Sequence, residues 1–295
     1  LMARVLRVQN KVFYTIGSSG HEGNAMVARL ARHTDPAFLH YRSGGFMAER
    51  FRKLPGMDPV MDSALSFAAS AEDPASGGRH PLPSRERFAQ WLSSIGFRND
   101  MQAVVYDRQG CNFCGRLWWM LKWAGHDAVA VLDGGLPAWT AAGGATSQGD
   151  EPSHFQSNFA LHDSLRQLVT ANEVEAHLQQ PERQTLIDAR APARYRGEVE
   201  PLDPVAGHIP GALNRPFSEN IALDGRFKPQ ALLKAEFDAL LQGRDPATVV
   251  HQCGSGVSAL PNLLAMEIAG FPPTRLFAGS WSEWCSHPAR PVAKG

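Results

Sequence analysis

The sequence predicts an α/β fold in which a mainly parallel sheet, covered by helices on both faces, occurs twice along the chain. Short apolar runs typical of buried strands alternate with helical patterns, and this alternation is typical of parallel sheets. One apolar run ends at Asp107 and Trp139 follows 32 residues later, and a similar run ends at Cys253 and Trp284 follows 31 residues later. This long repeat indicates a duplicated domain rather than a solenoid.

The elements of the first copy follow from its apolar spacing. The helix expected after Ser84 ends at Gly96, and a strand should then end at Asp107. A helix should follow over 116–124 and a second strand over 128–132. The apolar stripe of the first helix consists of Phe88, Trp91, Leu92 and Ile95.

The second copy carries clearer boundary signals. Thr170 and Glu173 form the pattern of a capping box at a helix start, and residues 184–188 are typical of a buried strand. A further helix should begin near Pro229, and the helix after Cys253 should hold Pro261 in its first turn. The Pro229 helix is expected to bury Leu232, Leu233, Phe237, Leu240 and Leu241.

Composition shifts place the domain boundaries. Residues 146–162 are rich in Gly, Ser, Gln and Pro and are the expected linker, so we expect domains at 1–145 and 163–295. Residues 1–75 are atypical, because they show little strand signal and only a short amphipathic piece at 27–30.

Bulk composition narrows the function. The chain has 295 residues, 29 basic and 29 acidic side chains and a formal net charge of zero, which argues against nucleic-acid and anionic-membrane partners. No apolar run approaches the length of a membrane-spanning helix. Four cysteines in a chain of this length do not form a disulfide framework, so a reducing cytoplasm is expected.

The most informative motif is the segment that starts at Cys253, where an apolar strand leads into a glycine-rich turn and then a helix. A thiolate at such a place faces unpaired backbone N–H groups and the positive end of a helix dipole, which makes cysteines reactive. Gly254 and Gly256 let the backbone approach the sulfur, and Ser255 and Ser258 add hydroxyl groups. The alternative is a buried structural cysteine at a strand end.

This loop resembles the active-site loop of the rhodanese sulfurtransferases, in the version found in 3-mercaptopyruvate sulfurtransferases. Ser258 stands where that version usually has Thr. The resemblance covers roughly residues 77–295. Its other motifs are Arg79-His80-Pro81-Leu82-Pro83, Asp188-Ala189-Arg190, Gly207-His208-Ile209-Pro210-Gly211-Ala212 and Gly279-Ser280-Trp281-Ser282-Glu283-Trp284.

The resemblance implies two tandem rhodanese-like domains and a sulfurtransferase activity. Sulfane sulfur would pass from 3-mercaptopyruvate through a Cys253 persulfide to cyanide or to a thiol, such as thioredoxin or a small thiol, without metal or organic cofactor. Asp107 occupies the position of Cys253 in the first domain, which should therefore be silent. The alternatives are a thiosulfate:cyanide sulfurtransferase and a non-enzymatic sulfur carrier or regulatory module. A cysteine phosphatase would need an arginine where Ala259 stands.

The resemblance also implies roles for individual residues. Gly254, Ser255, Gly256, Val257 and Ser258 would surround the donor sulfur.

Two arginines would bind the donor carboxylate, namely Arg190 with help from Arg194. The alternative for Arg190 is a structural ion pair with an acid such as Glu198.

His80 would work with Ser255 as a proton shuttle, and the alternative is a structural histidine. The aspartate that the family pairs with this histidine has only Asp58 and Asp62 as weak candidates.

Donor choice follows from the residues after the cysteine. Relatives that prefer thiosulfate, a dianion, carry Arg-Lys there, whereas this chain has Gly254 and Ser255. We therefore expect 3-mercaptopyruvate to be favoured by more than about tenfold in catalytic efficiency.

Three further residues are interpreted without a role in catalysis. Cys111 and Cys114 form a Cys-x-x-Cys that is expected to be a chance pair, with a redox function as the alternative. A metal site is not expected, because no second pair of cysteines has suitable spacing. His208 is expected to close a turn by hydrogen bonding.

Overall fold

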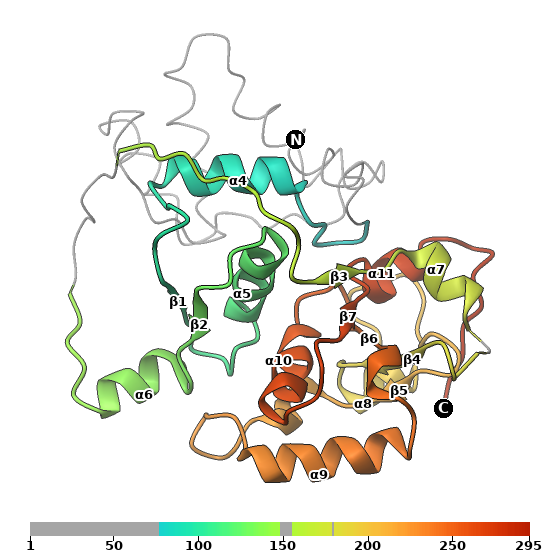
Figure 1. The fold of residues 1–295 in the computed structure, drawn as a ribbon. Coiled ribbons are helices and arrows are strands. Elements are labelled where there is room, and N and C mark those ends of the chain that lie inside the picture. Colours follow the sequence, from blue (N-terminus) through green and yellow to red (C-terminus); the bar gives the residue numbers. More distant parts are fainter. Residues whose placement is uncertain (1–76, 148–154, 179) are drawn as a thin grey trace, which may run out of the picture. The chain divides into compact units, whose positions relative to one another are not determined.

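The computed structural model describes residues 77–147, 155–178 and 180–295 (Figure 1). The predictions for residues 1–75, including Asp58 and Asp62, lie outside the described residues. Within the described ranges, no helix has the length and apolar character needed to cross a membrane.

Both sheets are parallel, as the strand–helix alternation predicts. The smaller one pairs β1 (Ala103–Val105) with β2 (Val129–Val131). The larger one has five strands in the order β3-β7-β6-β4-β5, and every pair in it is parallel. Its strands are β3 (Gln167–Leu168), β4 (Thr185–Asp188), β5 (Leu213–Asn214), β6 (Val249–Gln252) and β7 (Arg275–Leu276).

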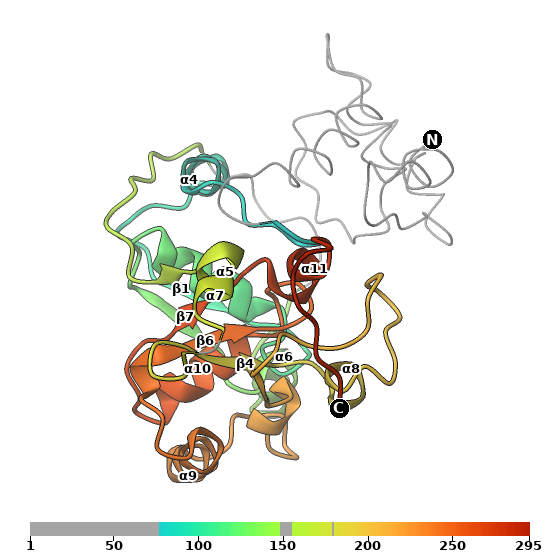
Figure 2. The ribbon, with the colours of Figure 1, turned by 90° about the vertical axis from the view of Figure 1, so that its right-hand side faces the viewer.

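Helices cover the two faces of the larger sheet because alternate residues of a strand point to opposite sides. Leu186 and Val250 pack with α7 (Ala171–Ala176) and α11 (Ser280–Trp284). Their neighbours Ile187 and Val249 pack with α9 (Gln230–Leu241) and α10 (Leu260–Ile268). Figures 1 and 2 show α9 and α11 on opposite sides of these strands. All residues of β4 and β6 are buried, as central strands of such a sheet require.

The signals at the helix ends of the second copy are confirmed. The Thr170 side chain accepts from the N–H of Glu173, and the Glu173 carboxylate accepts from the N–H of Thr170 in a complete capping box. Pro261 lies in the first turn of α10.

Two expected apolar stripes are narrower than predicted. In α4 (Arg85–Ser94), Phe88 and Leu92 are buried, whereas Trp91 and the following Ile95 are exposed. In α9, Leu232 is exposed because Leu233, Phe237 and Leu241 already form the row that faces the sheet. Leu240, which lies seven residues after Leu233, is partly buried against the same core.

Residues 77–146 and 156–295 belong to one compact unit. Their shared core joins α5 (Cys114–Trp123) to the start of α10 and to the neighbourhood of Cys253. The remaining elements are the helices α6 (Gly135–Ala141) and α8 (Pro192–Tyr195) and the 3-10 turns η2 (Phe217–Asn220) and η3 (Pro246–Thr248).

Candidate active site

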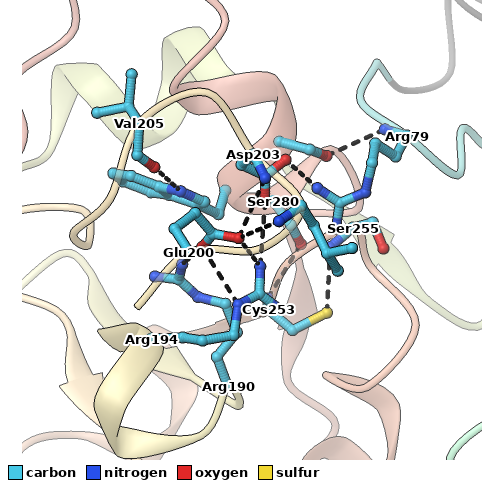
Figure 3. A network of polar contacts seen from close by, with 12 residues as sticks. Arg79, Arg190, Arg194, Glu200, Asp203, Val205, Cys253, Ser255 and Ser280 are labelled. Atoms are coloured by element: carbon cyan, nitrogen blue, oxygen red, sulfur yellow. Dashed lines mark hydrogen bonds and ion pairs between the residues drawn. The ribbon is translucent and has the colours of Figure 1, made fainter. Parts of the chain in front are cut away.

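Cys253 lies directly after β6, at the carboxyl edge of the parallel sheet, and only 2% of the residue is exposed. The N–H of Cys253 donates to the Ser280 hydroxyl at 3.1 Å, and its carbonyl accepts from the N–H of Trp281 at 3.0 Å. The N–H of Ser255 approaches the sulfur at 3.5 Å (Figure 3). The loop is thereby fixed to the start of α11, and a backbone donor faces the sulfur.

The two loop glycines meet different surroundings. Gly256 has φ +73°, and a Cβ atom there would lie 2.1 Å from the carbonyl oxygen of Ala278, so the loop requires glycine at this position. A Cβ atom on Gly254 would lie 3.1 Å from Nη2 of Arg79 and 3.4 Å from Nη1 of Arg194. Two guanidinium groups therefore converge beside the residue that follows Cys253.

His80 and Ser255 are brought together, with 2.7 Å between Nδ1 and Oγ. The loss of water around the imidazole and the charges of Arg79 and Arg116 lower the pKa of His80 to about 4, although the residue as a whole is exposed. His80 is consequently neutral at neutral pH. No carboxylate of the described residues is hydrogen-bonded to its ring. This pair can pass a proton between the imidazole and the serine hydroxyl.

Three arginines near the loop pair with three carboxylates, and Figure 3 shows Arg79, Arg190 and Arg194 around two of them, Glu200 and Asp203. The Glu200 carboxylate accepts from Arg194 at 2.7 Å and from Arg190 at 3.4 Å. Asp203 pairs with Arg194 at 3.2 Å and also with Arg79. The third carboxylate belongs to Asp188. This network links the segment that carries His80 to the loop after α8.

Arg190 is held more tightly than the sequence predicts. Its Nε and Nη2 donate to the Asp188 carboxylate at 2.7–3.1 Å, and Nη2 also donates to the Gly207 carbonyl at 2.8 Å. The guanidinium stacks on the Trp281 ring at 4.8 Å. Burial acts to lower the pKa of Arg190, but the ion pairs outweigh it and the pKa is raised. These contacts favour the ion-pair alternative, with Asp188 and Glu200 as partners.

Glu198, the partner suggested for Arg190, instead pairs with Arg196 at 2.6 Å. Arg194 keeps a partly exposed side chain and lies nearer Gly254. Val257 and Ser258 are half-buried in the loop. The roles of these residues toward a donor stay predictions.

Arg116 is a site residue that the sequence analysis missed. It lies in the first turn of α5, and its Nη1 donates to the Gly256 carbonyl at 2.9 Å. Its Nη2 donates to the His80 carbonyl at 2.8 Å. The available signal was the repeat, because Arg116 lies at the start of the predicted helix that corresponds to the one after the Cys253 loop.

The corresponding loop of the first copy contains a carboxylate where the second has a thiol. Asp107 accepts from the N–H groups of Gln109, Cys111, Phe113 and Cys114 at 2.8–3.1 Å. Burial acts to raise the pKa of Asp107, but these hydrogen bonds outweigh it and the pKa is lowered. An ionised side chain thus satisfies the backbone donors of this loop.

Cys111 and Cys114 are both buried free thiols. A hydrogen bond with Cys111 and burial raise the pKa of Cys114 well above its ordinary range. Cys285 is also buried and free, and burial raises its pKa to about 11. No cluster of three or more possible metal ligands occurs among the residues that the structure describes. His208 closes its turn as predicted, with Nδ1 2.8 Å from the Tyr195 carbonyl.

Comparison with known proteins identifies the class. The chain belongs to the rhodanese-like domain family, which matches residues 63–142 and 170–287. It is a sulfurtransferase with two rhodanese-like domains.

Individual relatives agree with this assignment. The chain is 50% identical over 219 residues to a probable 3-mercaptopyruvate sulfurtransferase of Pseudomonas aeruginosa, covering 74% of this chain and 76% of the relative. It is 36% identical to a thiosulfate sulfurtransferase of Bos taurus, with 72% of each chain covered. The structure of SseA from Escherichia coli, a 3-mercaptopyruvate sulfotransferase by its description, aligns with a TM-score of 0.61 at 32% identity, covering 72% of this chain and 77% of SseA.

Proposed function

We propose that this protein transfers sulfane sulfur from 3-mercaptopyruvate to a thiol or cyanide acceptor, with Cys253 as the carrier. The observation that carries the proposal is the position of the Cys253 sulfur, which faces a backbone N–H beside the Ser255–His80 pair. The 50% identity to a probable 3-mercaptopyruvate sulfurtransferase supports this donor.

In the first half-reaction, the Cys253 thiolate attacks the donor sulfur. The new S–S bond forms as the C–S bond of the donor breaks, and its electrons leave with pyruvate as the enolate. The enolate then takes up a proton, for which Ser255 and neutral His80 form the nearest relay. Cys253 is left as a persulfide, so the enzyme stores the transferred atom between two steps.

In the second half-reaction, an acceptor thiolate attacks the outer sulfur of the persulfide. The S–S bond breaks, the acceptor carries the sulfur away and the Cys253 thiolate returns. Cyanide would take the same atom as thiocyanate. We infer a small thiol or thioredoxin as the acceptor and a reducing cytoplasm as the setting, because all four cysteines are free thiols.

Thiosulfate is the second candidate donor, and one observation favours it. The guanidinium nitrogens of Arg79 and Arg194 lie beside Gly254, so positive charge is present where the loop itself has none. A dianion would benefit from this charge more than a monoanion. The expected preference for 3-mercaptopyruvate must therefore be measured against thiosulfate.

The carrier role is tested with Cys253→Ser and with the control Cys285→Ser, which removes another buried thiol. After donor treatment, mass spectrometry should find one added sulfur, about 32 Da, on the Cys253 peptide of the wild type. Cys253→Ser should lose sulfur transfer and remain folded, whereas Cys285→Ser should retain activity. Sulfur on Cys111 or Cys114 instead would contradict the assignment.

Steady-state kinetics of the wild-type protein with each donor tests which donor it prefers. We expect catalytic efficiency with 3-mercaptopyruvate to exceed that with thiosulfate by more than about tenfold. Equal or better efficiency with thiosulfate would overturn the donor assignment and leave the carrier role intact. A wild type that accepts sulfur from neither donor would overturn both.

A further inference from the structure

Arg116 connects the two segments that build the candidate active site. One guanidinium nitrogen donates to the carbonyl of Gly256 in the Cys253 loop, and the other donates to the carbonyl of His80. The planar guanidinium can satisfy both acceptors at once because its donors point in fixed, different directions. Arg116 therefore joins the loop to the His80 segment, in addition to the direct contact between His80 and Ser255.

Arg116 also differs from the other arginines of the site in its charge balance. Arg79, Arg190 and Arg194 each pair with at least one carboxylate, whereas Arg116 has no carboxylate partner among the described residues. Burial lowers the pKa of Arg116 to about 10, so it stays protonated at neutral pH.

This unpaired charge is close enough to interact electrostatically with Cys253. Arg190 also interacts with Cys253, but the Asp188 and Glu200 carboxylates offset its charge. The neighbouring His80 is neutral. Of the four arginines at the site, Arg116 is thus the one whose charge no carboxylate of the described residues offsets.

The first copy of the domain holds Arg116 in place. The Asp107 carboxylate accepts from the N–H groups of Phe113 and Cys114, which fixes the turn at the start of α5. Gly115 allows α5 to approach α10 closely, because a Cβ atom there would lie 3.2 Å from the Cβ of Leu260. The silent loop thereby presents Arg116 to the loop that carries Cys253.

We propose that Arg116 is a positioning residue for sulfur transfer, which fixes the Cys253 loop against His80 and supplies the positive charge that offsets the anionic sulfur. This inference rests on the proposed function, because the charge matters most when the sulfur is a thiolate or persulfide anion. In a site with little water, a fixed cation stabilises such an anion without rearranging during the reaction.

The test separates charge from shape with Arg116→Lys and Arg116→Met. Lysine keeps the charge and can reach one carbonyl, whereas methionine keeps only the bulk. The control is Lys122→Met on the same helix, where the charge pairs with an exposed aspartate. Single-turnover persulfide formation with 3-mercaptopyruvate should slow by about tenfold or more in Arg116→Met. It should recover substantially in Arg116→Lys and stay unchanged in Lys122→Met.

Equal losses in the lysine and methionine variants would overturn the charge role, and a wild-type rate in Arg116→Met would overturn the whole inference. If Arg116→Met does not fold, the comparison is made between Arg116→Lys and Arg116→Gln, which differ in charge.

Alkylation of Cys253 by iodoacetamide without any donor gives an independent readout. It should slow in the neutral variants and recover with lysine. If the wild type accepts sulfur from neither donor, the proposed function fails and the alkylation rates still decide the role of Arg116.

Discussion

At the scale of single residues, Gly256 allows the Cys253 loop to adopt its backbone conformation against Ala278. Its φ of +73° is strained for other residues, and the Ala278 carbonyl occupies the space where a side chain would begin. Gly243 has a similar φ of +84° but nothing within 4 Å of its Cβ position. Alanine substitutions at these two glycines therefore distinguish the cost of backbone strain from the cost of a direct clash.

Gly256→Ala should lower the free energy of unfolding by clearly more than Gly243→Ala. Positive φ alone costs about 1 kcal/mol for a non-glycine residue, and both variants bear that cost. Only Gly256→Ala must also move the Ala278 carbonyl, which shifts the loop around the sulfur. Urea unfolding and sulfur transfer measure the two effects. Equal stability losses with full activity in both variants would show that the loop adapts to the methyl group.

Contacts at the site were predictable where the family resemblance implies them. The contact between Ser255 and His80, which lie far apart in the sequence, is one that the resemblance implies and the structure shows. Arg116 did not follow, because its partners are backbone carbonyls, and any residue at those positions has one. For Arg190, the sequence predicted an ion pair as an alternative but suggested Glu198 as the partner. The loop after α8 instead places Glu200 beside Arg190.

At the scale of elements, β6 carries a buried histidine shortly before the Cys253 loop. His251 is fully buried, and both ring nitrogens lack a hydrogen-bond partner among the described residues. Burial lowers its pKa to about 3, so the native state holds it neutral. The unfolded chain takes up a proton near pH 6.5, the ordinary value for histidine. Acid should therefore favour the unfolded state through this residue.

Between pH 6.5 and pH 4, His251 should remove on the order of 3 kcal/mol from the free energy of unfolding. The contribution of His251 to the free energy of unfolding is fully present above pH 6.5. It is lost as the pH falls toward 3, because only the unfolded state binds the proton in that range. His251→Leu should flatten this dependence. Denaturant unfolding over the range measures it, with His287→Leu at an exposed position as the control. An unchanged slope in His251→Leu would show that the ring finds a proton acceptor when charged.

At the scale of the whole molecule, the duplication was predictable from the repeat, but the contacts of the first copy with the Cys253 loop were not. The strand–helix alternation predicts parallel strands covered on both faces, and β4 and β6 are a buried parallel pair. The polar contacts between the copies include the ion pair of Arg79 with Asp203 and the hydrogen bond from the Arg79 N–H to the Ser282 hydroxyl, and these join residues 124 and 203 positions apart that no local pattern relates. A single core then includes residues of both copies.

Arg79 should influence donor choice through this contact between copies. It lies beside Gly254 and pairs with Asp203, so Arg79→Gln removes a positive charge near the sulfur and leaves Asp203 with Arg194 alone. The change in potential acts about twice as strongly on dianionic thiosulfate as on monoanionic 3-mercaptopyruvate. The ratio of catalytic efficiencies, 3-mercaptopyruvate over thiosulfate, should rise by about three- to tenfold. Arg98→Gln, which breaks an exposed ion pair with Asp100, is the matched control and should leave the ratio unchanged. If Arg79→Gln reduced both efficiencies by the same factor, Arg79 would act by holding the His80 segment in place rather than by its charge.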